Sequence, residues 1–195
     1  NGGTGNDVLQ ATFSSALGSP LPLSGIEELR VNSTANGSSF SLLNVSGVNK
    51  VTVDSDDTAN TLTVDNTVVT STAQTWPELA FRGDGTAAAQ TYDTITYNAF
   101  GASASTGDKL TVSFANRATA LNATGTTNAH STASLTVGGS ASNGIETLTI
   151  NASDGPLSVT GATNVWNLNT LTVTGSSNVT LTTITSNDNN ITSVT

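Results

Sequence analysis

The first residues of the chain have types and a spacing suited to binding a calcium ion. Residues 2–9 read Gly-Gly-Thr-Gly-Asn-Asp-Val-Leu. Glycines permit turns in which carbonyl oxygens converge, and the aspartate adds a carboxylate. Calcium takes about six to eight such oxygens, so the candidate ligands are Gly3, Gly5 and Asp7. One copy offers too few oxygens for a complete site, and no second copy follows at residues 11–18.

Further aspartates lie in two predicted turns. Asp54, Asp56 and Asp57 follow a strand-like run, while Asp84 lies between two glycines with Asp93 nearby. Carboxylates that alternate in a turn can bind calcium, and the alternative is a solvated turn. A further aspartate, Asp108, is interpreted as a plain turn residue. The candidate metal ligands therefore also include Asp54, Asp56, Asp57, Asp84 and Asp93.

Catalytic groups are poorly represented. The absence of cysteine excludes disulfides, zinc–thiolate sites and thiol catalysis. Glycosidic chemistry needs paired carboxylates in a cleft, yet most acidic residues here lie in predicted turns. The single histidine, His130, stands in an Ala/Thr/Ser-rich stretch and is interpreted as a solvated loop residue. We therefore expect that the protein is not an enzyme.

A repeated strand pattern indicates the elements that hold these residues. An apolar residue, two others, an apolar residue, one other and a β-branched residue recur 22 or 23 positions apart near both ends of the chain. Alternate side chains of a strand point to opposite faces, so Leu148 and Ile150 should face the core and Thr147 and Thr149 should face outward. The copies are residues 26–31, 48–53, 145–150 and 168–173, with a further start at 191, and second strands lie between them at 40–42, 62–64, 157–159 and 179–181.

The repeat predicts how these strands are arranged. A coil of two strands and two turns cannot bury its apolar side alone, whereas stacked coils make a continuous core. We predict an all-β fold, a parallel β-solenoid (β-helix or β-roll) with two strands per 22–23-residue coil and a looped middle insertion. The alternative is a β-sandwich or meander with antiparallel strands, which shows a similar strand spacing. No helix is well supported, and the best candidate is short, at residues 76–80.

Four parts are expected along the chain. Residues 1–10 are the end of a calcium-binding repeat, residues 11–66 and 144–195 are solenoid coils, and residues 67–143 are an irregular β segment with long loops, including 115–133. The chain begins at Asn1 without an initiator methionine or a signal-peptide pattern. We therefore expect an excised fragment.

The composition excludes several classes of partner. The 195 residues carry a net charge of −9 with only 5 Lys and Arg, and 81 of them are Ser, Thr or Asn. So few cations cannot neutralise a run of phosphates, and nucleic acid is therefore not an expected partner. No apolar stretch approaches the roughly 20 residues of a bilayer span. An acidic, lysine-poor surface favours a location outside the cell.

The motif at residues 2–9 gives a resemblance to a known family. It resembles the calcium-binding nonapeptide of RTX-type bacterial surface proteins, especially calcium-dependent surface-layer proteins and large secreted adhesins of Gram-negative bacteria. The resemblance implies type I secretion, calcium-triggered folding outside the cell, and a lattice or adhesive function at the bacterial cell surface. The chain departs from the family in two ways: it has no tandem nonapeptide array, and its repeat is more than twice as long as a nonapeptide.

Three functions are consistent with these features. The first is a structural component of an extracellular assembly, a surface layer or surface fibre, stabilised by calcium and associating with copies of itself and with cell-surface polysaccharide. The second is a ligand- or ice-binding adhesin module, suggested by outward threonines such as Thr170, Thr172 and Thr174. The third is a β-helix enzyme that degrades polysaccharides. We expect the first, because no cluster of catalytic groups is evident.

Overall fold

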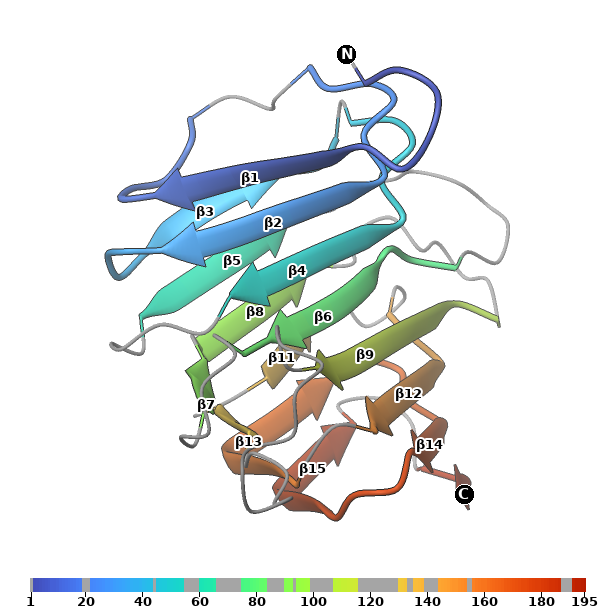
Figure 1. The fold of residues 1–195 in the computed structure, drawn as a ribbon. Helices are drawn as coiled ribbons and strands as arrows, with labels where there is room; N and C mark the ends of the chain where they lie inside the picture. Colours follow the sequence, from blue (N-terminus) through green and yellow to red (C-terminus); the bar gives the residue numbers. More distant parts are fainter. Residues whose placement is uncertain are drawn as a thin grey trace, which may run out of the picture.

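The chain folds into two parallel β-sheets that lie face to face (Figure 1). The computed structural model describes residues 2–18, 22–43, 45–54, 60–65, 75–83, 90–92, 94–98, 107–115, 130–132, 135–138, 144–153, 156–186 and 191–195. Sheet A runs β1 (Val8–Phe13), β2 (Glu28–Ser33), β4 (Lys50–Asp54), β6 (Glu78–Arg82), β9 (Lys109–Ala115), β12 (Thr147–Ala152), β14 (Thr170–Thr174) and β16 (Ser193–Val194).

Sheet B forms the second layer. It contains β3 (Ser38–Ser41), β5 (Thr61–Asp65), β8 (Thr94–Asn98), β11 (Leu135–Gly138), β13 (Leu157–Val165), β10 (His130–Thr132) and β7 (Gln90–Tyr92), and β15 (Val179–Ser186) pairs with β13. The strand pairings in the described part of the chain are all parallel. The all-β prediction is confirmed. The alternative, a β-sandwich or meander with antiparallel strands, does not describe these pairings.

The register follows the sequence repeat at both ends of the sheets. Leu29 pairs with Val51, and these two residues hold the same position in successive copies of the repeated pattern. Leu148 pairs with Leu171 in the same way. In the middle the same ladder continues over longer intervals of sequence, because Val112 pairs with Ile150. Residues 67–143 thus contribute β6 to β11 to the same two sheets, with longer stretches of chain between some of these strands.

The structure assigns strands at two places in the middle of the chain where the sequence suggested other local structure. The short helix candidate at residues 76–80 instead leads into strand β6, because Leu79 and Phe81 alternate with outward Glu78 and both need burial in the core. His130, expected in a loop, is the first residue of β10 and pairs with Leu157. A three-residue strand leaves almost no periodic signal in an Ala/Ser/Thr-rich sequence.

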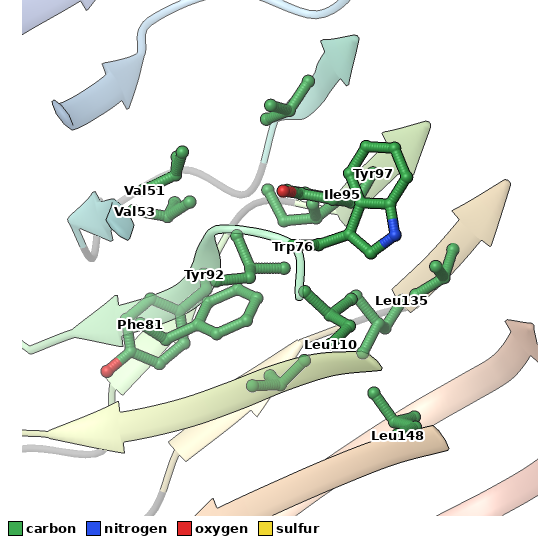
Figure 2. Close-up of a cluster of buried hydrophobic side chains, with 14 of the residues drawn as sticks. Val51, Val53, Trp76, Phe81, Tyr92, Ile95, Tyr97, Leu110, Leu135 and Leu148 are labelled. Carbon is green, nitrogen blue, oxygen red and sulfur yellow. The ribbon is translucent and has the colours of Figure 1, made fainter. Parts of the chain in front are cut away.

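The core lies between the sheets and consists of their inward side chains. Leu148 and Ile150 are buried while Thr147 and Thr149 are only partly covered, as the strand period predicts. Figure 2 shows side chains from both sheets converging in the middle of the molecule. There Phe81 stacks on Phe114 with ring centroids 4.7 Å apart, and Phe81 and Tyr92 pack edge to face with ring centroids 5.1 Å apart.

The outermost strands bury their apolar residues only partly. Leu9 and Ala11 of β1 pack against the core from one end. At the other end Leu181 and Ile184 of β15 do the same, and Val194 of β16 remains 69% exposed. Both ends of the described strand ladder therefore present backbone edges beside apolar side chains.

Candidate functional site

The N-terminal motif forms a compact turn closed by its own aspartate. The main-chain N–H of Gly3 donates to Oδ2 of Asp7 at 2.8 Å, and Gly5 adopts a positive φ of 129°. Gly2 lies directly against the next turn, since a Cβ on it would come within 1.5 Å of the carbonyl oxygen of Gly25. The glycines at positions 2 and 5 are thus required by close backbone contact and by a positive φ, respectively.

Asp7 also connects this turn to strand β2. Its carbonyl oxygen accepts hydrogen bonds from the N–H groups of Glu27 at 3.1 Å and Glu28 at 3.2 Å. In return, Oε2 of Glu27 accepts from the N–H of Asp7 at 2.7 Å. The register continues into the strands, where Leu9 pairs with Leu29. Asp7 therefore stands at the same position before β1 as Glu27 does before β2.

This contact recurs along the edge where the strands of sheet A begin. The carbonyl oxygen of Glu27 accepts from Asn49 and Lys50, and that of Glu146 accepts from Asn169 and Thr170. Each accepting residue stands immediately before a strand of sheet A, and we call this set the corner series. It comprises Asp7, Glu27, Asn49, Asp108, Glu146 and Asn169.

A residue of positive φ precedes several of these corners. Gly25, Gly47 and Asn167 have positive φ values of 63°, 94° and 61°, and each lies two positions before a member of the corner series. Gly5 stands at the same distance from Asp7. The corner series has a signal in the sequence. The second position of the repeated strand pattern is Glu, Asn, Glu and Asn in four copies. Sequence reasoning missed it and interpreted Asp108 as a plain turn residue, although it is fully buried.

Asp7 is engaged by hydrogen bonds within the protein, and calcium binding by Gly3, Gly5 and Asp7 stays a prediction. One carboxylate oxygen of Asp7 accepts a hydrogen bond from the N–H of Gly3. The carbonyl oxygen of Asp7 accepts hydrogen bonds from the N–H groups of Glu27 and Glu28. Calcium takes about six to eight oxygens and prefers several carboxylates. In the part of the chain that the structure describes, no group of three or more Asp, Glu, His or Cys side chains is placed to hold a metal.

Asp54 ends strand β4 and is bound by a cation of the neighbouring strand. Arg82 donates from Nε to Oδ1 at 2.7 Å and from Nη2 to Oδ2 at 2.9 Å. The side chains of Asp54 and Arg82 are only 6% and 18% exposed. A bidentate guanidinium engages both carboxylate oxygens, and calcium binding by Asp54 stays a prediction. Asp56, Asp57, Asp84 and Asp93 lie outside the described residues, and calcium binding there remains a prediction.

Further charges form an ion-pair network on the outward face of β2, β4 and β6. Arg30 donates to both carboxylate oxygens of Glu28, at 2.9 and 3.1 Å, and the Thr52 hydroxyl donates to Oε1 of Glu28 at 2.7 Å. Lys50 lies 3.7 Å from a carboxylate oxygen of Glu78, which also accepts from the Ser113 hydroxyl.

These contacts set the pKa of Glu28. Burial alone raises that pKa, but the hydrogen bonds from Arg30 and Thr52 and the charges of Arg30 and Lys50 outweigh it, so the pKa lies below its ordinary value of 4.5. The hydrogen bond to Glu28 in turn raises the pKa of Arg30. Glu28 is therefore ionised in the folded protein at neutral pH.

The remaining outward faces are polar and almost uncharged. In sheet A, Thr111, Thr149 and Thr172 form one cross-strand row through β9, β12 and β14. Sheet B carries a longer row of hydroxyl and amide side chains: Ser39, Thr63, Thr96, Thr136 and Asn164. Of the lysines and arginines in the described ranges, all four lie on sheet A. Positive charge in this part of the chain is thus confined to one sheet.

Within the described ranges, no helix is long and apolar enough to cross a membrane. No family model matches the chain, and comparisons with curated proteins and with solved structures also find no match.

Proposed function

We propose that the chain is a β-solenoid segment of a bacterial extracellular assembly, a surface layer or surface fibre, that associates with copies of itself. The observation that carries the proposal is the parallel register, which continues from β1 to β16 in sheet A through connections of different lengths. Strands that keep one register make an elongated body with regular faces, which suits repeated lateral contact.

The nature of the outward faces supports this role. The cross-strand rows of Thr, Ser and Asn are regular and uncharged, because strands lie about 4.8 Å apart and threonine packs well on a pleated surface. Two such faces from neighbouring copies meet without burying an unpaired charge. The ion-pair network of β2, β4 and β6 satisfies its own charges and does not need a partner.

Calcium binding at the N-terminal motif and in the acidic turns is part of the proposal. The candidate ligands are Gly3, Gly5, Asp7, Asp54, Asp56, Asp57, Asp84 and Asp93, and the resemblance at residues 2–9 supplies the reason to test them. Circular dichroism and light scattering in calcium and in a chelator test this part. We expect assembly to fall in the chelator, whereas an unchanged β signal with unchanged assembly contradicts calcium dependence.

Electron microscopy of the purified chain, together with light scattering, tests self-association. We expect ordered sheets or fibres for the wild type. Thr149→Lys with Thr172→Lys places like charges on adjacent strands of the uncharged face, and we expect these to reduce assembly. The control Gln10→Lys adds the same type of charge on exposed β1, at the opposite end of sheet A. Discrete wild-type monomers at high concentration contradict the proposal.

A binding module for a regular hydroxylated or crystalline surface is the second candidate. The row from Ser39 to Asn164 on sheet B favours it, because this row repeats polar hydrogen-bonding groups on five successive strands. Ice-shaping and polysaccharide pull-down assays with the monomeric chain test it. Thr96→Lys in the centre of the row should abolish such binding, whereas the double variant on sheet A should leave it intact.

A further inference from the structure

One contact of the corner series differs from the rest by its burial. Asp108 is fully buried and Glu146 is 8% exposed. The N–H of Asp108 donates to Oε2 of Glu146 at 2.7 Å, and the carbonyl oxygen of Asp108 accepts from Thr147 at 3.0 Å. These bonds join the start of β9 to the start of β12, so a carboxyl group takes part in holding the two layers together.

We propose that protonation of Glu146 stabilises the Asp108–Glu146 contact, so that a neutral Glu146 holds β12 to β9 more firmly than its carboxylate does. Either form of the side chain offers an oxygen to the N–H of Asp108. The neutral form avoids the penalty of a desolvated negative charge beside a second acid.

The charges around Glu146 support this assignment. On β9 the facing titratable groups are Asp108 and the exposed Lys109, whose strand position pairs with Thr147. The other neighbour in sheet A, β14, is preceded by uncharged Asn169, and β11 and β13 of sheet B carry no titratable side chain. Among the described residues, Asp108 is therefore the acid whose charge Glu146 meets at close range.

The pKa of Glu146 is raised above its ordinary value of 4.5. The main cause is burial, and the charge of Asp108 acts in the same direction, while the hydrogen bonds from the N–H groups of Asp108 and of Glu146 itself act against it. An acid that binds its proton more tightly in the folded state stabilises the fold fully below 4.5. That contribution is lost as the pH rises through the folded-state pKa.

The chain contains a matched control for this corner. Glu27 makes the same contact, accepting from the N–H of Asp7 at 2.7 Å, but at a partly exposed position. Changing either glutamate to glutamine keeps an oxygen acceptor and removes the titration. The two variants therefore separate the effect of burial from the effect of the hydrogen bond itself.

Urea unfolding of the full chain at mildly acidic and at neutral pH tests the proposal. Glu146→Gln should reduce the loss of midpoint urea concentration on going to neutral pH and should raise the midpoint at neutral pH, whereas Glu27→Gln should change this pH dependence less. A wild-type slope retained in Glu146→Gln overturns the proposal, as does an equal change in both variants.

A measurement on the unmodified protein covers the case in which Glu146→Gln does not fold. The main-chain amide of Asp108 donates a hydrogen bond to Glu146, so the hydrogen-exchange protection of this amide reports directly on the contact between the two residues. After correction for the intrinsic exchange rate, protection of this amide should fall as the pH rises above 4.5. Protection that stays constant or increases over that range contradicts the proposal.

Discussion

Arg82 binds Asp54 with two parallel hydrogen bonds, Nε to Oδ1 at 2.7 Å and Nη2 to Oδ2 at 2.9 Å. The two residues come from β4 and β6, and they pair directly in sheet A at the ends of these strands. Their side chains are largely shielded from solvent, unlike those of the other ion pairs on this face. Loss of one partner should therefore cost more stability here than at the more exposed pairs.

Arg82→Met should destabilise the fold by roughly 3 kcal/mol, because it leaves the buried carboxylate of Asp54 without its cation. The matched control is Arg30→Met, which removes a similar bidentate bond to Glu28 where the arginine is 32% exposed. We expect that variant to lose about 1 kcal/mol or less. Urea unfolding at neutral pH measures both free energies, and equal losses contradict the ranking.

Backbone contact at Gly144 gives a second prediction. A Cβ on this residue would lie 2.2 Å from the carbonyl oxygen of Trp166, an atom of the main chain that cannot move aside as a side chain does. Gly144→Ala should therefore cost about 1–3 kcal/mol through forced separation of the two turns.

Gly3→Ala is the control for Gly144→Ala. No atom lies within 4 Å of a Cβ built on Gly3, and its φ is not in the left-handed region. The free energy of unfolding of Gly3→Ala should stay within about 0.5 kcal/mol of the wild type. Thermal and urea unfolding of the two variants should place them far apart, and similar midpoints contradict the close approach at Gly144.

The sequence contained most of the strand arrangement at both ends of the chain. The pattern around Leu148 and Leu171 has regular alternation and a constant interval, and both features come directly from how a strand buries one face. In the middle the interval grows while the register persists, so periodicity alone did not show that Leu79 and Val112 are neighbours. Pairing of strands is decided by the whole sheet, which local sequence does not report.

The candidate site was harder to predict for a different reason. An aspartate in a Gly/Asn-rich turn has the composition of a metal ligand, but its partners decide what it binds. Asp54 is bound by an arginine of the neighbouring strand, and Asp7 is held by Gly3 and by Glu27 of the next layer. The spacing of residues within one turn carries no information on partners that come from a neighbouring strand or turn.

The contacts of Glu28 predict how the fold responds to acid. Its pKa lies below 4.5 in the folded protein, so the carboxylate contributes stability that is present above 4.5 and lost as the pH falls through the folded-state pKa. Glu28→Gln should therefore flatten the loss of stability on the acid side, opposite in sign to the effect expected for Glu146→Gln. The control Thr52→Val removes only one hydrogen bond to Glu28 and should weaken the acid dependence without abolishing it. Unfolding midpoints followed from neutral pH to below 4.5 measure this slope, and an unchanged slope in Glu28→Gln would show that the ion pair with Arg30 adds nothing to stability.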